Sequence, residues 1–307
     1  MPSLQSWILI FGIRRMKFFA KDDIDPVAMR VRAEKFTSPV KPPRGVERIS
    51  VKEQGVDGEW LIPHGAEDDS VVLYIHGGAW FLGSTNTHRR LAGALAKVSG
   101  VRVLSINYRL APEHPFPAAL EDCQAAYEWL LAQGIAPGNI IVAGDSAGGN
   151  LALALLVSLR DQGKALPAGA VGISPVTDLT GSGASYQTRR KLDPYFNQMG
   201  NNSLSRDYLG TADAHHPYLS PLFADLSGLP PLLIQVGDHE ILLDDSILFG
   251  EKARAAGVQV EVQVWQGMFH VFQLYADILP EARQALAHVA QFMRARLETN
   301  PTVETSG

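Results

Sequence analysis

The 307-residue chain contains a single cysteine, which excludes an intrachain disulfide framework. Cys123 shares one predicted helical stripe with Phe116, Leu120, Tyr127 and Leu131. We therefore expect it to lie in the core rather than to act as a nucleophile. A chain without disulfides is typical of a reducing compartment, so we expect a cytoplasmic location.

Clustered positive charge is absent as well. The chain has 27 Lys and Arg against 32 Asp and Glu, a formal net charge of −5 and a pI near 6.0. Its longest basic run is Arg189-Arg190-Lys191, which fits a solvated loop. Without a basic face, the sequence predicts no nucleic-acid partner.

Long apolar runs are missing too. No segment approaches the roughly 20 apolar residues that cross a bilayer. The short run Trp7–Phe11 is followed by Arg14, Arg15 and Lys17, whereas the basic residues of a signal peptide precede its apolar run. We therefore expect no integral membrane contact.

The N-terminal apolar run has two interpretations. It forms either an amphipathic helix that folds onto the main domain or an interfacial helix that touches lipid. We favour the first, because Asp22, Asp23 and Asp25 follow and would oppose an anionic surface.

The composition is that of a globular protein, with 46% hydrophobic and 19% charged residues and no internal repeats. Three prolines within residues 39–44 mark a join between two parts of the chain. We therefore expect an N-terminal cap segment (1–45) followed by the main domain (46–307).

Apolar runs and helical patterns alternate along the main domain. Strands are expected near residues 47–53, 57–62, 70–75, 101–106, 140–143, 169–173, 231–236 and 259–264. Helices are expected near 87–99, 117–133, 147–161, 245–256 and 280–297, with Asp244 as the N-cap of the fourth and Gly257 as its stop. This order predicts an α/β fold with a mostly parallel central sheet flanked by helices on both faces.

In such sheets, ligands bind at the carboxyl ends of the strands. A segment of about 179–218 interrupts the alternation and is long, polar and aromatic. Long insertions over this edge are usually functional lids, so we expect a cap insertion here.

Residues 144–148, Gly-Asp-Ser-Ala-Gly, form the most informative motif, because they join the predicted strand 140–143 to an Ala- and Leu-rich helix. A serine between two glycines at such a junction fits a nucleophile elbow, in which small residues let the backbone bend and Ser146 projects above the sheet. An ordinary glycine-rich turn is the alternative, and the strand–turn–helix context argues against it.

A serine nucleophile needs a general base, and the base needs a partner that fixes its tautomer. Among nine histidines, His270 follows the predicted strand 259–264 in a loop at the sheet edge, whereas His88 merely begins a helix. We expect His270 to be the base. The acid should follow another strand between Ser146 and His270. The candidates there are Asp238, Glu240, Asp244 and Asp245, and spacing alone does not choose among them.

Acyl transfer also needs donors for the developing oxyanion. Residues 76–80, His-Gly-Gly-Ala-Trp, follow the predicted strand 70–75. Small residues there let backbone amides approach a substrate carbonyl, together with the amide of Ala147. A simple Gly-Gly turn is the alternative, which the neighbouring elbow argues against.

These motifs together resemble the hormone-sensitive-lipase family of α/β-hydrolases, also called bacterial family IV esterases. The resemblance rests on residues 76–80, on 108–119 (Tyr-Arg-Leu-Ala-Pro-Glu-His-Pro-Phe-Pro-Ala-Ala), on 144–150 (Gly-Asp-Ser-Ala-Gly-Gly-Asn) and on the loops of Glu240 and His270. The motifs span most of the chain, and segment 108–119 is highly specific. The resemblance implies an α/β-hydrolase fold with a helical cap.

The resemblance also helps to choose the acid. The family usually has Asp-Pro-Leu-x-Asp-Glu in the acid loop, and this pattern places the acid on Glu240, with Asp238 second. The extra methylene of glutamate requires the loop to sit slightly further from His270. Ala79 stands where the family commonly has glycine, but its amide can still donate, and His76 is expected to brace the loop. The oxyanion-hole residues are then Gly77, Gly78, Ala79 and Ala147, with the amides of the last three as donors.

The resemblance implies a carboxylic-ester hydrolase that acts on short-to-medium acyl esters through an acyl-enzyme on Ser146. It implies a small-molecule ester as partner and no metal or organic cofactor, and homodimers are common in the family. Aromatic residues suit short acyl chains, although they could equally be lid packing. The substrate-binding candidates are Trp80, Phe81, Tyr195 and Phe196.

Two other functions use the same scaffold. Amidases and deacetylases share the triad, and some family members are receptors that bind ligands without catalysis. Retention of Ser146, His270 and a candidate acid argues for an enzyme. Epoxide and haloalkane hydrolases use an aspartate nucleophile, which residue 146 is not.

Overall fold

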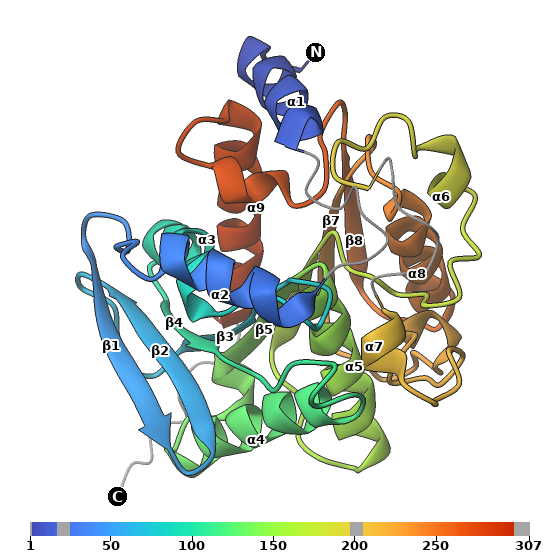
Figure 1. Cartoon of the computed structure of the whole chain (residues 1–307). Helices are drawn as coiled ribbons and strands as arrows, with labels where there is room; N and C mark the ends of the chain where they lie inside the picture. The colour runs from blue at the N-terminus through green and yellow to red at the C-terminus, as the bar shows by residue number, and fades with distance from the viewer. Residues whose placement is uncertain (1, 17–24, 197–204, 298–307) are drawn as a thin grey trace, which may run out of the picture.

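The computed structural model describes residues 2–16, 25–196 and 205–297. Within them, an eight-stranded sheet has the order β1-β2-β4-β3-β5-β6-β7-β8 (Figure 1). The strands are β1 (Val46–Glu53), β2 (Val56–Pro63), β3 (Val71–Ile75), β4 (Arg102–Ile106), β5 (Ile140–Asp145), β6 (Gly169–Ile173), β7 (Leu232–Gly237) and β8 (Val260–Trp265). The pairs β1–β2 and β2–β4 are antiparallel, and the other pairs are parallel. The predicted mostly parallel sheet is confirmed.

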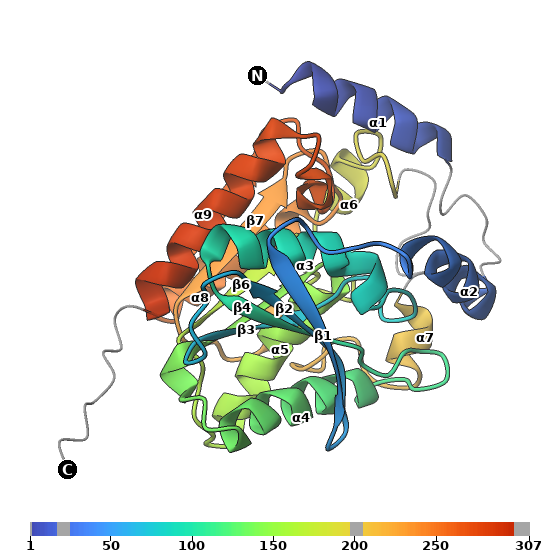
Figure 2. The same cartoon turned by 90° about the vertical axis from the view of Figure 1, so that its left-hand side faces the viewer.

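Helices cover both faces of this sheet (Figures 1 and 2). On one face lie α3 (Thr85–Ser99) and α9 (Pro280–Leu297), and on the other lie α4 (Ala118–Ala132), α5 (Ala147–Asp161) and α8 (Leu243–Ala255). Alternate residues of β3 enter the two apolar clusters, Leu73 with α4 and α5, and Val72 with α3. Because both faces of β3 are buried, its sequence is an unbroken apolar run.

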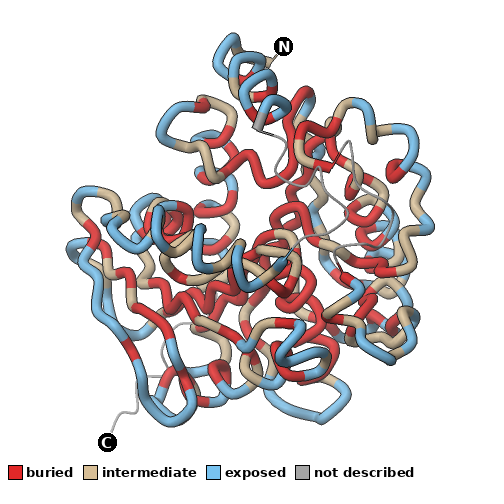
Figure 3. The backbone as a smooth tube through the Cα atoms, in the orientation of Figure 1, coloured by how far each residue is buried: buried red, intermediate tan, exposed pale blue. Residues whose placement is uncertain are grey.

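The central strands and α5 are the most deeply buried elements, whereas the outer strand β1 is largely exposed (Figure 3). Residues 147–159 of α5 are all buried. A helix covered on every side must be apolar all round, which explains its Ala- and Leu-rich sequence. Cys123 is also buried, as expected for a core residue.

The expected N-cap of α8 is wrong. The helix begins at Leu243, one residue before Asp244, and no side chain caps it. The Asp244 carboxylate instead accepts from the backbone N–H of Ser185 in the segment after β6. A long-range tertiary contact thus holds the carboxylate that local sequence assigned to the helix end.

Two helices precede the sheet, α1 (Leu4–Met16) and α2 (Pro26–Thr37). The carboxylate of Asp25 caps α2 by accepting from two backbone N–H groups, and Pro26 suits the first helical position. Between β6 and β7, the chain forms the short helices α6 (Ser185–Thr188) and α7 (Arg206–Leu209). The division into a cap segment, main domain and cap insertion stays a prediction.

Candidate active site

The junction between β5 and α5 carries Ser146 in a sharp turn. Its backbone has φ +52° and ψ −119°, a conformation that residues other than glycine rarely adopt. The turn is very tight, because a Cβ on Gly148 would lie 2.0 Å from the Ile75 carbonyl oxygen. A Cβ on Gly144 would lie 2.3 Å from the carbonyl oxygen of Gly148. Both positions therefore require glycine.

Three polar side chains from separate loops meet at this turn. The Ser146 hydroxyl lies 2.9 Å from Nε2 of His270, which follows β8. Nδ1 of His270 lies 2.8 Å from the Glu240 carboxylate, which follows β7. All three residues come just after parallel strands, so the sheet brings together groups that lie up to 124 residues apart in sequence.

The surroundings of Glu240 hold its carboxylate in a fixed orientation. The side chain is completely buried, and its Oε1 accepts from the Ser174 hydroxyl at 2.8 Å and from the Gly237 amide at 2.5 Å. Burial alone would lower the pKa of His270, but the hydrogen bond and charge of Glu240 outweigh it and raise this pKa. The imidazolium form of His270 is therefore stabilised by its carboxylate partner.

The other candidate acids are occupied elsewhere. Asp238 accepts from the Gly267 amide at 2.6 Å and is partly exposed. Asp244 accepts from the Ser185 amide, and Asp245 accepts from the amides of Thr177 and Asp178. The structure thus places Glu240, rather than these three, against His270.

The loop after β3 has the backbone that an oxyanion hole needs. Gly78 has φ +124°, and a Cβ there would lie 2.0 Å from the Leu82 carbonyl oxygen, so glycine is required. Ala79 continues the turn at φ +52°. Within the described part of the chain, the amides of Gly78, Ala79 and Ala147 donate to no protein acceptor.

Gly77 belongs to the oxyanion loop but is not one of its three expected donors. Its amide donates to the Asp145 carboxylate at 3.1 Å and is therefore committed to the protein interior. The same carboxylate accepts from the Tyr74 hydroxyl at 2.6 Å and lies 3.3 Å from Nε2 of His88. Burial raises the pKa of Asp145, but the His88 charge and these hydrogen bonds reverse the shift and lower it. Asp145, which directly precedes Ser146, thus ties the oxyanion loop to the turn that carries the serine.

His76 lies within the same buried network. Its Nδ1 is 2.8 Å from the Gly77 carbonyl oxygen, and its ring stacks on Tyr108 at 4.3 Å. Burial and the neighbouring His88 lower the pKa of His76 to about 3, so the ring is neutral and Nδ1–H donates. This contact fits the bracing role expected for His76.

The four aromatic candidates have different surroundings. Phe196 packs against His270 edge-on, with ring centroids 5.0 Å apart. Trp80 is buried and stacks on Tyr208 at 4.8 Å. Phe81 is buried beside the oxyanion loop. Tyr195 instead hydrogen-bonds Tyr275 and packs against the apolar cluster around Phe269, which favours a packing role for this ring.

A buried carboxylate that sequence reasoning missed joins the segment after β6 to the loop of Glu240. Asp193 accepts from the amides of Tyr195 and Phe196 and, through its other oxygen, from the amide of Ile241. Burial raises its pKa to about 6. In the sequence, the clue to Asp193 was its position two residues before the aromatic pair Tyr195-Phe196. Ser174 was also missed, although it follows β6 as the other site residues follow their strands.

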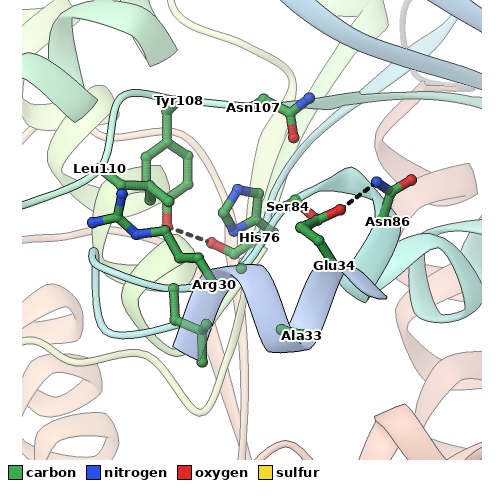
Figure 4. A pocket seen from close by; sticks show the side chains of 11 residues that line it. Arg30, Ala33, Glu34, His76, Ser84, Asn86, Asn107, Tyr108 and Leu110 are labelled. Atoms are coloured by element: carbon green, nitrogen blue, oxygen red, sulfur yellow. Dashed lines mark hydrogen bonds between the residues drawn. The ribbon is translucent and has the colours of Figure 1, made fainter. Parts of the chain in front are cut away.

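A cavity of about 310 Å³ lies between α2 and the oxyanion loop (Figure 4). Arg30 and Glu34 of α2 line it together with His76, Ser84 and other residues, but neither Ser146 nor His270 does. The Arg30 guanidinium donates to the Phe81 carbonyl oxygen at 2.7 Å. The cavity therefore lies beside the oxyanion loop, and it is distinct from the site of Ser146 and His270.

Comparison with known proteins agrees with this geometry. Residues 72–274 match a family model described as the alpha/beta hydrolase fold. The chain is 46% identical to an acetyl-hydrolase of Streptomyces hygroscopicus over 236 residues, which make up 77% of this chain and 79% of that protein.

Solved structures are similar over nearly the whole chain. An esterase from the bacterial hormone-sensitive lipase family has a TM-score of 0.91 and 41% identity, covering 97% of this chain and 100% of the other. The esterase EstE5, in crystals soaked with p-nitrophenyl butyrate, has a TM-score of 0.91 and 43% identity, covering 96% and 99%.

Proposed function

The chain belongs to the hormone-sensitive-lipase family of α/β-hydrolases, and we propose that this carboxylesterase cleaves its ester through an acyl-enzyme on Ser146. The hydrogen-bonded series Ser146–His270–Glu240 is the observation that carries the proposal. In this arrangement the nucleophile has a base, and the base has a buried carboxylate that fixes its tautomer.

The first step forms the acyl-enzyme. Ser146 Oγ attacks the ester carbonyl carbon while Nε2 of His270 takes the hydroxyl proton. The resulting imidazolium is stabilised by Glu240, and it then gives the proton to the leaving alcohol. The oxyanion receives hydrogen bonds from the amides of Gly78, Ala79 and Ala147, which have no other acceptor among the described residues.

The second step regenerates the enzyme. Water attacks the acyl carbon, His270 takes its proton, and Ser146 leaves with that proton as the carboxylic acid departs. Preorganisation of the oxyanion loop by Asp145 and His76 lets the donors act without rearranging.

We propose short-to-medium acyl esters as substrates. Phe196 packs against His270, and a bulky ring there limits the space beside Ser146. The similarity to an acetyl-hydrolase, and to an esterase soaked with p-nitrophenyl butyrate, supports the same range. Long acyl chains would have to displace Phe196.

The test uses a series of p-nitrophenyl esters of rising acyl length with wild type and Ser146→Ala. We expect kcat/KM to peak at a short or medium chain and Ser146→Ala to lose essentially all turnover. A serine-reactive inhibitor should label wild type but not the variant. Undiminished turnover by Ser146→Ala would refute the nucleophile, and a maximum at long chains would refute the substrate range.

The cellular location and the assembly state are proposals drawn from the sequence. Among the described residues, no helix is both long and apolar enough to cross a bilayer. Burial keeps the pKa of the Cys123 thiol well above its ordinary value, which suits a reduced, unreactive core cysteine. We propose a cytoplasmic location, which cell fractionation would test, and light scattering would show whether the chain forms the homodimer that is common in the family.

A further inference from the structure

Helix α1 presents large apolar side chains to solvent. They recur at helical spacing and are Leu4, Trp7, Ile8 and Phe11, each between 55% and 73% exposed. The buried side of the same helix carries Ser6, Ile10 and Ile13. The helix thus folds onto the domain with one stripe, as the favoured interpretation predicts, and leaves a second apolar stripe uncovered.

Contacts at both ends hold α1 in this orientation. The amide and hydroxyl of Ser3 both donate to the Glu281 carboxylate at 2.6 and 3.0 Å. At the other end, Arg14 donates to the carbonyl oxygens of Lys191 and Leu192 at 3.0 and 2.9 Å. The outward stripe is therefore a fixed surface, since the inner stripe and both ends are already engaged.

The inner stripe connects α1 to the catalytic loop. Ile10 and Ile13 belong to the same apolar cluster as Met268, Phe269 and Phe272, which flank His270 in the chain. In Figures 1 and 2, α1 lies at the outside of the molecule beyond α9, with its outer side uncovered.

The charges of α1 suit a phosphate-bearing surface. The helix contains no carboxylate, and its last turn carries Arg14 and Arg15. Arg15 is exposed and lies over the Phe11 ring at 4.5 Å, so a cation stands beside the apolar stripe. Tryptophan, leucine and phenylalanine next to arginine are the side chains that interfacial helices place at the boundary between headgroups and acyl chains.

We propose that α1 docks the protein on the surface of a phospholipid bilayer, with its outward stripe buried at the headgroup boundary and Arg15 against lipid phosphate. A protein partner fits this face less well, because a stable interface uses about 20 to 30 residues a side and the stripe has four large side chains. Of the acidic residues that opposed this view, Asp25 caps α2, and Asp22 and Asp23 lie outside the described residues.

The proposal does not rest on the esterase mechanism, because binding is measured without turnover. The full chain is centrifuged with vesicles of phosphatidylcholine containing about a quarter phosphatidylglycerol, at low salt. We expect wild type to co-sediment and Trp7→Ser/Ile8→Ser to lose about tenfold in partition coefficient. Turnover of a soluble p-nitrophenyl ester and the melting temperature should stay unchanged.

Two further variants make the test specific. Val98→Ser/Leu248→Ser removes two exposed apolar side chains from α3 and α8 instead, and this variant should bind vesicles as wild type does. Arg15→Glu should weaken binding to anionic vesicles more than to pure phosphatidylcholine. This variant tests the proposal even if Trp7→Ser/Ile8→Ser fails to fold.

Three results would overturn the proposal. Wild type could fail to sediment with either vesicle type, or the α3/α8 control could lose as much binding as the α1 variant. The third is a stable dimer without lipid that Trp7→Ser/Ile8→Ser converts to monomer in light scattering, since the stripe would then be covered by a second copy of the chain.

Discussion

Glu240→Gln removes one negative charge from the proposed triad while preserving the shape of the side chain. The change also affects the tautomer of His270. Oε1 of Glu240 accepts two hydrogen bonds, from Ser174 and Gly237, whereas Oε2 accepts one, from Nδ1 of His270. The glutamine carbonyl oxygen is best placed on the side with two donors, and its NH₂ then faces Nδ1. Nδ1 must become the acceptor, and Nε2–H would point at Ser146, which disables the base.

The charge term gives the size of the effect. A carboxylate and an imidazolium with charges about 4 Å apart interact by about 4 kcal/mol at an effective dielectric constant of about 20. Loss of this stabilisation in the transition state corresponds to about a thousandfold in kcat, since about 1.4 kcal/mol is tenfold. The wrong tautomer adds to this, and triads that lose the charged acid fall by about ten-thousandfold. We therefore expect a loss of about 10³ to 10⁴ in kcat for Glu240→Gln.

The assay measures kcat and kcat/KM on p-nitrophenyl acetate across pH, with melting temperature as the test of folding. Because Glu240 raises the pKa of His270 and the base must be neutral, kcat/KM of wild type should rise with pH through a pKa above the ordinary histidine value. Residual activity of Glu240→Gln should show this limb at lower pH. Asp238→Asn is the matched control and should lose less than about fivefold, because Asp238 contacts the Gly267 amide and His239 rather than His270. A loss below about tenfold for Glu240→Gln, or a larger loss for Asp238→Asn, would refute the assignment of the acid.

Three further predictions concern buried aspartates. Asp145→Ala leaves the Gly77 amide and the Tyr74 hydroxyl without their acceptor, so kcat should fall about a hundredfold with little change in KM. Asp145→Asn should retain most of the wild-type kcat. Equal losses of kcat in both variants would contradict the bracing role. Asp193→Asn loses the acceptor for the Ile241 amide, so KM for p-nitrophenyl butyrate should rise more than kcat falls, and an unchanged KM would contradict a role in holding the lid. Burial raises the pKa of Asp245 to about 8, so the folded state binds its proton more tightly than the unfolded state does. The contribution of Asp245 to wild-type stability therefore falls as pH rises from about 4 to about 8. Asp245→Asn carries no such charge, so its melting temperature relative to wild type should be higher at alkaline pH than at acid pH, and a pH-independent difference would contradict the shifted pKa.

Much of the fold follows from local pattern. All eight strands lie within about two residues of the ranges expected from the sequence. The central strands β3, β5, β6 and β7 are covered on both faces, which explains their largely apolar sequences. The elbow was equally visible, since Gly144 and Gly148 have no sterically tolerable replacement and flank a serine at a strand end. Helix boundaries were less predictable, as α8 shows, because a distant amide holds Asp244.

The sequence by itself indicated the order of the strands along the chain, the candidate nucleophile Ser146, and the expectation that loops after parallel strands would meet at one edge. Only the tertiary structure showed which of the four acidic side chains lies against His270, because Asp238 and Glu240 lie in the loop after β7 whereas Asp244 and Asp245 lie in the first turn of α8. It likewise decided that the Gly77 amide faces Asp145 rather than substrate, and that Ser174 and His88 support the site. It also resolved the N-terminal helix into two stripes, since packing buries Ile10 and Ile13 while the opposite side of α1 finds no protein surface within reach among the described residues.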